Sequence, residues 1–547
     1  MQQGLEAASV AKGYSLSIGI VLRQGVERCP EQKIVYADQT RVSYRDLSAR
    51  VARLACGLSR LGIRAGDTVA VMDWDSHRYL ECFFAIPMMG ATLHMINVRL
   101  SPEQILYTIN HAEDDLILVN GEFLPLLEQI WERIEGRKTL VLLNDGSAEP
   151  TTRLPVTQEY EPLLAGADPD FDFPEFAEDA IATTFYTTGT TGLPKGVAFS
   201  HRQIILHTLS ASAALAAGGH GRFDETDVYM PITPMFHVHA WGIPYVATAM
   251  GVKQVYPGRY VPERLLDLLI RERVTFSHCV PTILQMVLAA AQAKGTALPG
   301  WKVVVGGAAL PHALARQALE MGIDVYAGYG MSETCPILTL SRLQSEMKDW
   351  PLERQIEFRC KTGRPMPLVR VRVVDSAMRD VPADGKSQGE IVVRAPWATH
   401  GYVKDAAGTA RLWEGGWLHT GDLAVCDEYG YLKITDRLKD VIKSGGEWVS
   451  SIDLEDLILE HPGLAEAAVI GVSDPKWTER PLAVVVAKPG VPVSPGEVEA
   501  RLLELAARGK ISRYAIPQQI VFVDALPRTS VGKVDKKVLR ARYADAG

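Results

Sequence analysis

Residues 185–202 read "FYTTGTTGLPKGVAFSHR" and join an apolar segment to a turn that is rich in glycine and hydroxyl side chains. Gly189 and Gly192 permit backbone conformations that bring N–H groups close to an anion. A polar surface turn with an incidental lysine is the alternative, which the unbroken run of such residues disfavours. The stretch therefore predicts a triphosphate-binding loop, in which further donors come from Thr187, Thr188, Thr190, Thr191 and Lys195.

The loop differs from the common nucleotide-binding pattern, in which a Gly-Lys step is followed by Ser or Thr. That hydroxyl places magnesium and the loop then opens a helix. Here Lys195 follows Pro194 and precedes Gly196. We therefore expect a loop that holds a triphosphate but is poorly suited to cleavage between its β and γ phosphates.

The bulk composition is that of a globular protein with several domains. The chain has 547 residues, of which 47% are hydrophobic and 22% charged, and this length suggests roughly three to four domain-sized units. A net charge of −8 argues against a nucleic-acid partner. Scattered cysteines without a Cys-x-x-Cys pair, no signal peptide and no apolar run of membrane-spanning length predict a cytoplasmic protein.

The first part of the chain alternates between helical and strand patterns. Residues 46–62 place an apolar stripe on one helical face, and "TVAVM" at 68–72 suits a buried strand. "SPEQ" at 101–104 is a capping box with proline at the first helical position. Strands separated by helices predict an α/β fold with parallel sheets that are covered on both faces.

Two changes of pattern follow towards the C-terminus. Short strands separated by turns predict a small β-rich subdomain at about 365–436, within an N-terminal domain of residues 1–436. Residues 437–547 then combine helices that start at 451 and 495 with strand-like runs. Their length suits an independent α+β domain.

The loop "YTTGTTGLPKG" resembles the signature of the adenylate-forming superfamily, which comprises acyl-CoA synthetases, amino-acid-activating domains and luciferase-like enzymes. The resemblance covers nearly the whole chain and is strongest to medium- and long-chain fatty-acyl-CoA ligases, including methylthiopropionate-activating relatives. Further family blocks follow in order: "MFHVHAWG" (235–242), "VVVGGAALP" (303–311), "GYGMSETCP" (328–336), "WLHTGDLA" (417–424), "DRLKDVIKSGGEWVS" (436–450) and "LPRTSVGK" (526–533).

The resemblance implies a ligase that uses ATP, Mg²⁺ and coenzyme A. A carboxylate attacks the α-phosphate of ATP to give acyl-adenylate and pyrophosphate, and the coenzyme A thiolate then displaces AMP. Positioning and electrostatic stabilisation would carry most of this catalysis. Its partners are small molecules, and similar synthetases include homodimers.

The resemblance also implies roles for single residues around the nucleotide. Glu333 and Thr190 would bind the metal, and Lys533 would deliver an ammonium to the α-phosphate. Tyr329 would stack on adenine, while Asp422 accepts hydrogen bonds from the ribose hydroxyls. The remaining nucleotide contacts and small residues against the acyl group or adenine are Ser332, Arg437, Gly306, Gly307, Ala308 and Gly330.

The C-terminal domain is expected to rotate between the two half-reactions. Lys439 corresponds to the hinge position of the family. In the rotated state, the pantetheine tunnel of coenzyme A would be lined by Lys443, Gly445, Gly446, Glu447 and Trp448. Lys533 would leave the site before the thiol enters.

The acid is expected to be aliphatic and of medium or long chain. Amino-acid-activating relatives carry an aspartate in the block that here reads Phe236, His237 and Val238. His237 would lie near the substrate carboxylate or be a core histidine, and Trp241 would be an aromatic gate or a packing residue. The alternatives are a short acid such as 3-methylthiopropionate, transfer to a carrier protein, luciferase-like oxidation and a non-catalytic binding protein.

Overall fold

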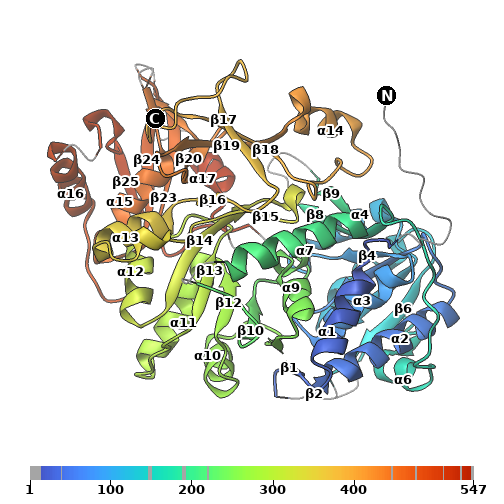
Figure 1. Cartoon of the computed structure of the whole chain (residues 1–547). Helices are drawn as coiled ribbons and strands as arrows, with labels where there is room; N and C mark the ends of the chain where they lie inside the picture. Colours follow the sequence, from blue (N-terminus) through green and yellow to red (C-terminus); the bar gives the residue numbers. More distant parts are fainter. Residues whose placement is uncertain are drawn as a thin grey trace, which may run out of the picture.

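The computed structural model describes residues 14–38, 40–145, 151–187, 193–217, 221–444, 447–474, 477–508, 511–529 and 533–543. Within these ranges the strands form four sheets, of seven, nine, four and five strands. Two large sheets and the helices between them make the body of the molecule, and the C-terminal elements lie together at one end of it (Figure 1).

The seven-stranded sheet has the order β7-β6-β5-β3-β4-β8-β9 and is parallel except for its last pair. The last pair forms a hairpin whose connection is the glycine-rich loop. The strands are β3 (Thr68–Met72), β4 (Thr92–Met95), β5 (Leu116–Asn120), β6 (Thr139–Leu143), β7 (Gln158–Glu159), β8 (Ile181–Thr187) and β9 (Lys195–Ser200).

The nine-stranded sheet has the order β16-β15-β14-β13-β12-β10-β11-β1-β2, with a parallel centre and antiparallel edges. The carboxyl ends of parallel strands are where open α/β sheets bind ligands. The strands are β1 (Lys33–Tyr36), β2 (Thr40–Ser43), β10 (Val228–Ile232), β11 (Lys253–Tyr256), β12 (Phe276–Cys279), β13 (Lys302–Val305), β14 (Asp324–Gly330), β15 (Ile337–Leu340) and β16 (Arg364–Pro365).

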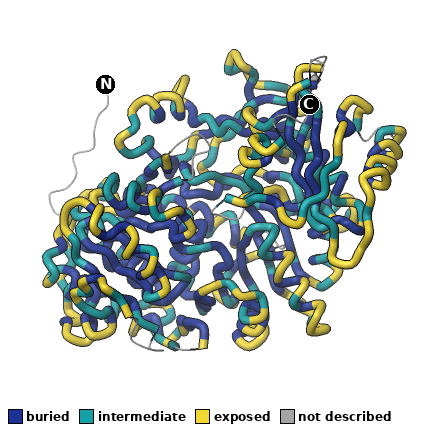
Figure 2. Tube along the Cα trace, turned by 180° about the vertical axis from the view of Figure 1, so that it is seen from behind, coloured by how far each residue is buried: buried dark blue, intermediate teal, exposed yellow. Residues whose placement is uncertain are grey.

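Helices cover these sheets and bury the core between them, as the dark centre of Figure 2 shows. The predicted helices and the strand at 68–72 are confirmed: Ser43 and Ser101 cap α2 and α4 through capping boxes. The helices are α1 (Ile18–Arg28), α2 (Tyr44–Arg60), α3 (His77–Met88), α4 (Pro102–Ala112), α5 (Leu124–Glu128), α6 (Tyr160–Ala165), α7 (His201–Ala216), α8 (Val238–Trp241), α9 (Ile243–Met250), α10 (Pro262–Arg271), α11 (Pro281–Ala293), α12 (His312–Glu320), α13 (Leu352–Cys360) and α14 (Ala406–Leu412).

The β-rich pattern after residue 365 corresponds to an antiparallel four-stranded sheet, β17-β18-β19-β20. Its strands are β17 (Arg370–Val374), β18 (Gly389–Arg394), β19 (Leu418–Cys426) and β20 (Leu432–Arg437). A separate hydrophobic cluster, which includes Ile391, Val393 and Leu418, lies beneath it.

The C-terminal part has its own sheet and core. Leu454, Ile458, Val469 and Leu502 are buried together there. The elements are β21 (Ile442–Ser444), β22 (Glu447–Val449), β23 (Leu464–Asp474), β24 (Thr478–Ala487), β25 (Gln519–Phe522), α15 (Ser451–Leu459), α16 (Pro495–Ala507) and α17 (Lys536–Arg542). Across the described ranges every helix is too short or too polar to cross a bilayer. The α/β fold with a smaller α+β C-terminal part agrees with the prediction.

Candidate active site

The glycine-rich loop is held at both ends by the β8–β9 hairpin. Thr187 ends β8 and lies opposite Lys195, which begins β9. The Lys195 ammonium lies 4.3 Å from the centre of the Tyr402 ring and 3.6 Å from Oδ2 of Asp405. The remaining predicted loop residues lie outside the described part of the chain: Thr188, Gly189, Thr190, Thr191 and Gly192.

Glu333 lies in a short 3-10 turn (Ser332–Thr334) directly after β14 and is 7% exposed. The Tyr402 hydroxyl donates a hydrogen bond of 2.6 Å to its Oε1. Burial raises the pKa of Glu333, while that hydrogen bond and the positive charges of Lys195 and Lys533 lower it. A buried carboxylate with cationic neighbours suits a site in which phosphate and metal charges balance each other.

Asp422 on β19 accepts a hydrogen bond from β14 and forms an ion pair with β20. The Tyr329 hydroxyl of β14 donates to its Oδ2 at 2.7 Å, and Nε of Arg437 on β20 lies 3.3 Å from Oδ1. Burial, and then the charge of Asp422, raise the pKa of Tyr329, so the phenol remains a donor. Three residues that the sequence assigned to the nucleotide are thus brought together. The predicted stacking of Tyr329 on adenine is not tested by this contact.

Lys533 reaches from the C-terminal part into the body of the molecule. Its Cε lies 3.6 Å from the position that a Cβ on Gly307 would take. Burial lowers the pKa of Lys533 to about 8, assisted by the charge of Arg437 and opposed by Asp422 and Glu333. The predicted catalytic lysine and the predicted metal ligand are therefore electrostatic neighbours.

A cavity of about 60 Å³ lies beside Lys533 at the carboxyl ends of β10 and β12. Its wall includes His237, Trp241 and Gly307, which the sequence predicted for the acid, together with Arg99 and Tyr260, which it did not. Apolar side chains such as Ile232, Val280 and Ile283 complete it. A largely apolar cavity with a few polar groups is typical of small-molecule sites.

The two histidines of the "FHVHAW" block have different surroundings. His239 is fully buried and its Nε2 lies 2.7 Å from Oγ1 of Thr183. His237 lines the cavity. Burial lowers the pKa of His237 to about 3, with smaller effects from Lys533 and Arg99. A neutral imidazole therefore faces the cavity.

Trp241 fills one side of the cavity from an unusual backbone. Residues 238–241 all have positive φ between 47° and 60°, followed by Gly242 at 72°. The indole stacks on His278 with ring centres 5.0 Å apart. An atom of the indole lies 2.9 Å from the position of a Cβ on Gly306, so a side chain there would displace the ring.

The structure gives individual surroundings for some of the other predicted residues. A Cβ on Gly330 would fall 1.9 Å from the Pro336 carbonyl oxygen, so this position admits only glycine. Ala308 is exposed and Ser332 is half-buried. Burial, and then the charge of Arg437, lower the pKa of Lys439. Lys443 is exposed on β21, while Gly445, Gly446 and the side chains of Glu447 and Trp448 lie outside the described part of the chain.

Tyr402, Tyr260 and Arg99 belong to the site but were missed by the sequence analysis. Tyr402 follows a His-Gly turn, and Arg99 precedes the capping box of α4. Each lies in a loop, where strand and helix periodicity gives no signal. A sequence signal was available only for a contact of Tyr260: Asp73, Asp75 and Ser76 follow the buried strand β3 directly, where α/β sheets bind ligands.

Three residues that the sequence assigned to the nucleotide and the metal, Lys533, Asp422 and Glu333, thus influence one another's charge at one site. The AMP-binding enzyme family model matches residues 22–403, and the AMP-binding enzyme C-terminal domain model matches residues 453–533. The chain belongs to the AMP-binding enzyme family. The superfamily predicted from the sequence is confirmed.

Curated relatives span nearly the same length. A long-chain-fatty-acid–CoA ligase of Thermus thermophilus is 42% identical over 92% of this chain and 90% of its own. A 3-methylmercaptopropionyl-CoA ligase of Ruegeria lacuscaerulensis is 40% identical over 93% of both chains. The crystal structure of the anthranilate CoA ligase AuaEII with anthranoyl-AMP has a TM-score of 0.85, at 24% identity over 99% of both chains, and supports the fold. The predicted enzyme class, an AMP-forming acid–thiol ligase that uses ATP and coenzyme A, is confirmed.

Proposed function

We propose that this enzyme activates an aliphatic carboxylic acid of medium or long chain with ATP and transfers the acyl group to coenzyme A. The main support for the proposal is the position of Lys533, which lines the cavity beside Gly307 and is influenced by the charges of Glu333 and Asp422. This position brings an ammonium to the point where a phosphate and a carboxylate would react.

The nucleotide would lie between the β8–β9 hairpin and Asp422 with its neighbours Tyr329 and Arg437. Lys195 supplies a positive charge at the base of the loop, and Asp422 offers a fixed carboxylate to ribose hydroxyls. Lys533 would stabilise negative charge that develops at the α-phosphate. Pyrophosphate then leaves and the acyl-adenylate remains.

The residues of the site suit a Mg²⁺ ion that is bound by the protein and by phosphate oxygens of ATP together. Among the described residues no group of three or more His, Cys, Asp or Glu could hold a metal by itself. Magnesium is typically bound by one or two carboxylates together with substrate phosphates, and Glu333 supplies such a carboxylate. Bound there, the ion would neutralise phosphate charge, while Tyr402 orients the carboxylate through its hydrogen bond.

The second half-reaction requires Lys533 to leave. The domain division at residues 1–436 and 437–547 is part of the proposal, and separate hydrophobic cores on either side of it support independent movement. Rotation near Lys439 would withdraw Lys533 and admit the thiol, with residues 443–448 lining its path.

The preference for an aliphatic acid rests on the walls of the cavity. The block Phe236–Val238, in which amino-acid-activating relatives would carry an aspartate, has no carboxylate here, and Ile232, Val280 and Ile283 of the cavity wall are apolar. The relative that acts on 3-methylmercaptopropionate keeps a short acid as the second candidate, because the cavity beside Trp241 is small.

Pyrophosphate release measured across straight-chain acids from acetate to palmitate, amino acids and aryl acids tests the proposal. We expect the highest kcat/KM for an unsubstituted aliphatic acid, and thioester formation with coenzyme A. A preference for amino or aryl acids would contradict it. Replacing coenzyme A by a phosphopantetheinyl carrier protein tests the carrier alternative, and a homodimer and a cytoplasmic location also stay predictions.

A further inference from the structure

The loop Asp73–Ser76, at the carboxyl end of β3, contacts the wall of the acid cavity from the side that faces away from the cavity. Asp75 in this loop is 2% exposed and lies outside all the family blocks. Its Oδ1 accepts a hydrogen bond of 2.8 Å from the backbone N–H of Met235, and its Oδ2 accepts one from the Tyr260 hydroxyl. Its carbonyl oxygen accepts a third from the N–H of Gly258 at 2.9 Å.

These partners are parts of the cavity wall. Tyr260 lines the cavity directly, and Met235 lies in the turn between Pro234 and His237, which both line it. The turn follows β10, and Gly258 and Tyr260 follow β11. Asp75 therefore joins loops of the nine-stranded sheet to a loop of the seven-stranded sheet, at the place where the acid is proposed to bind.

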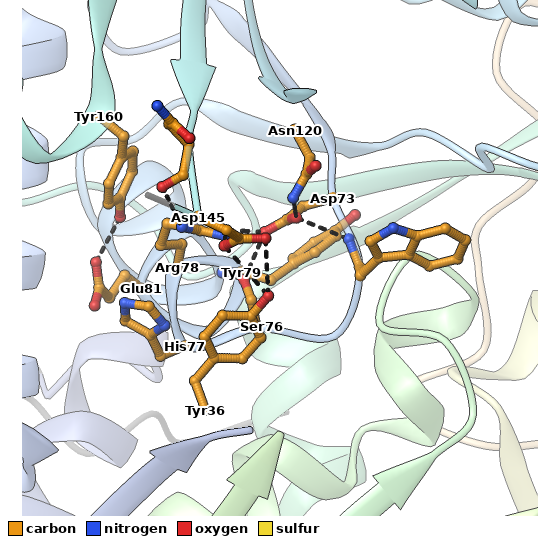
Figure 3. A network of polar contacts seen from close by, with 12 residues as sticks. Tyr36, Asp73, Ser76, His77, Arg78, Tyr79, Glu81, Asn120, Asp145 and Tyr160 are labelled. Carbon is orange, nitrogen blue, oxygen red and sulfur yellow. Dashed lines mark hydrogen bonds and ion pairs between the residues drawn. The ribbon is translucent and has the colours of Figure 1, made fainter. Parts of the chain in front are cut away.

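The loop that carries Asp75 is fixed by a second carboxylate, shown in Figure 3. Asp73 accepts hydrogen bonds of 2.5 Å from the Ser76 hydroxyl and 2.8 Å from the Asn120 amide. Ser76 in turn accepts a hydrogen bond from the N–H of Tyr79 and caps α3. Nε of Arg78 lies 3.8 Å from Asp73. The loop is thus fastened to β5 and α3, and it presents Asp75 from a rigid support.

The partners of Asp75 suit an ionised carboxylate, because Met235 and Tyr260 each donate to one of its oxygens. Burial raises the pKa of Asp75 to about 7, while these two hydrogen bonds lower it. An asparagine has only one carbonyl oxygen, so its NH₂ group would face either the Met235 N–H, which cannot accept, or the Tyr260 oxygen, whose own proton would then have to turn away. A buried donor left without an acceptor costs the desolvation of that group.

We propose that Asp75 is a positioning residue of the acid cavity. It holds the turn that bears His237 and the ring of Tyr260 in one geometry, so that the acid meets a preformed wall. This inference rests on the proposed function, because the cavity that Asp75 shapes is assigned to the acid. The nucleotide contacts come from other elements, so Asp75 affects the acid selectively.

The test compares Asp75→Asn with Asp227→Asn, in steady-state pyrophosphate release with acid and ATP varied separately. Asp227 is 5% exposed and accepts hydrogen bonds from Thr275 and Lys302. It directly precedes β10, whereas the turn with Met235 follows the other end of that strand. It is therefore a matched buried carboxylate remote from the cavity.

We expect Asp75→Asn to raise the KM for the acid about tenfold, with kcat and the KM for ATP within about threefold, as for one mispaired buried hydrogen bond. Asp227→Asn should leave all three constants within about twofold, although its Tm falls. Equal rises in both KM values, or an unchanged KM for the acid, would overturn the inference. A wild-type enzyme that activates no acid would instead refute the proposed function beneath it.

Tyr260→Phe keeps the assignment falsifiable if Asp75→Asn does not fold. It removes only the hydroxyl donor, and we expect a rise in the KM for the acid in the same direction. Where both single variants fold, the double variant should raise the KM by less than the product of the single effects, since one hydrogen bond joins the two residues. Multiplicative effects would overturn the pairing.

Discussion

The Tyr402 hydroxyl donates a hydrogen bond of 2.6 Å to Oε1 of Glu333. The two residues are 69 positions apart in the sequence, and a second contact joins their segments, because the N–H of Thr399 donates to the carbonyl oxygen of Glu333 at 2.8 Å. Lys195 lies over the same tyrosine ring. The tyrosine thus links the loop lysine to the proposed metal ligand.

Tyr402→Phe should lower kcat/KM for MgATP about tenfold, because a hydrogen bond to a charged carboxylate contributes about 1.5 kcal/mol. Tyr431→Phe is the matched control, since its hydroxyl donates to the Arg342 carbonyl oxygen away from the site. Steady-state kinetics at varied MgATP check this. Equal losses in the two variants would show that the Tyr402 effect is only structural.

Lys533→Ala should reduce adenylation by at least about a hundredfold, since removing one transition-state donor typically costs that much. The same variant should still convert supplied acyl-adenylate and coenzyme A to thioester, because Lys533 is proposed to be absent from that half-reaction. Each half-reaction is measured separately by pyrophosphate release and by thioester formation. Equal losses in both half-reactions would contradict the proposal that Lys533 acts in adenylation but not in thioester formation.

The rate of adenylation should fall above about pH 8. Lys533 has a pKa lowered to about 8, and only its charged form, which prevails below that pKa, stabilises the phosphate. We expect kcat/KM for ATP to be constant below this pH and to drop about tenfold per pH unit well above it. In Lys533→Arg this decrease above pH 8 should disappear, whatever the remaining rate. A decrease that persists unchanged would show that another group causes it.

Trp241→Leu should shift the preferred acid towards longer chains, because the indole fills one wall of the cavity. It should also lower the free energy of unfolding by about 2 kcal/mol through lost packing. Trp301→Leu, which removes a buried tryptophan that is 2% exposed at the far end of β13, should destabilise comparably and leave the chain-length profile unchanged. The profile is measured as kcat/KM from butyrate to palmitate. An unaltered profile in Trp241→Leu would make it a packing residue.

The enzyme should lose stability as the pH falls below about 6.5. Burial lowers the pKa of His207, His237, His239 and His278 to about 3, so these rings stay neutral when folded but take up protons once unfolded. Above pH 6.5 the rings are neutral in both states, and between pH 6.5 and pH 3 the folded state is destabilised by up to about 1.4 kcal/mol per histidine per pH unit. Urea unfolding at pH 7.5, 6.5 and 5.5 checks this, and a free energy of unfolding that is constant over this range would refute it.

The sequence predicted the fold class and the elements where local signals are strong. An apolar stripe predicted α2, a capping box predicted α4, and apolar runs predicted the parallel strands, because these signals depend on neighbouring residues. The family blocks likewise gave Glu333, Asp422 and Lys533 as candidates, and the structure brings these three into one electrostatic neighbourhood.

The rest depends on contacts between distant segments. Tyr402 meets Glu333, and Asp75 meets Met235 and Tyr260, only after two sheets have packed together. The difference between His237 and His239, which face a cavity and a threonine respectively, arises from a run of left-handed backbone that has no periodic signature. No local pattern encodes such pairings.

The most direct measurement is the nucleotide product. Purified enzyme is incubated with ATP labelled at the α-phosphate, magnesium and an aliphatic acid, with and without coenzyme A, and the products are separated. The account predicts AMP and pyrophosphate in amounts that match the thioester formed. Formation of ADP and inorganic phosphate would contradict it.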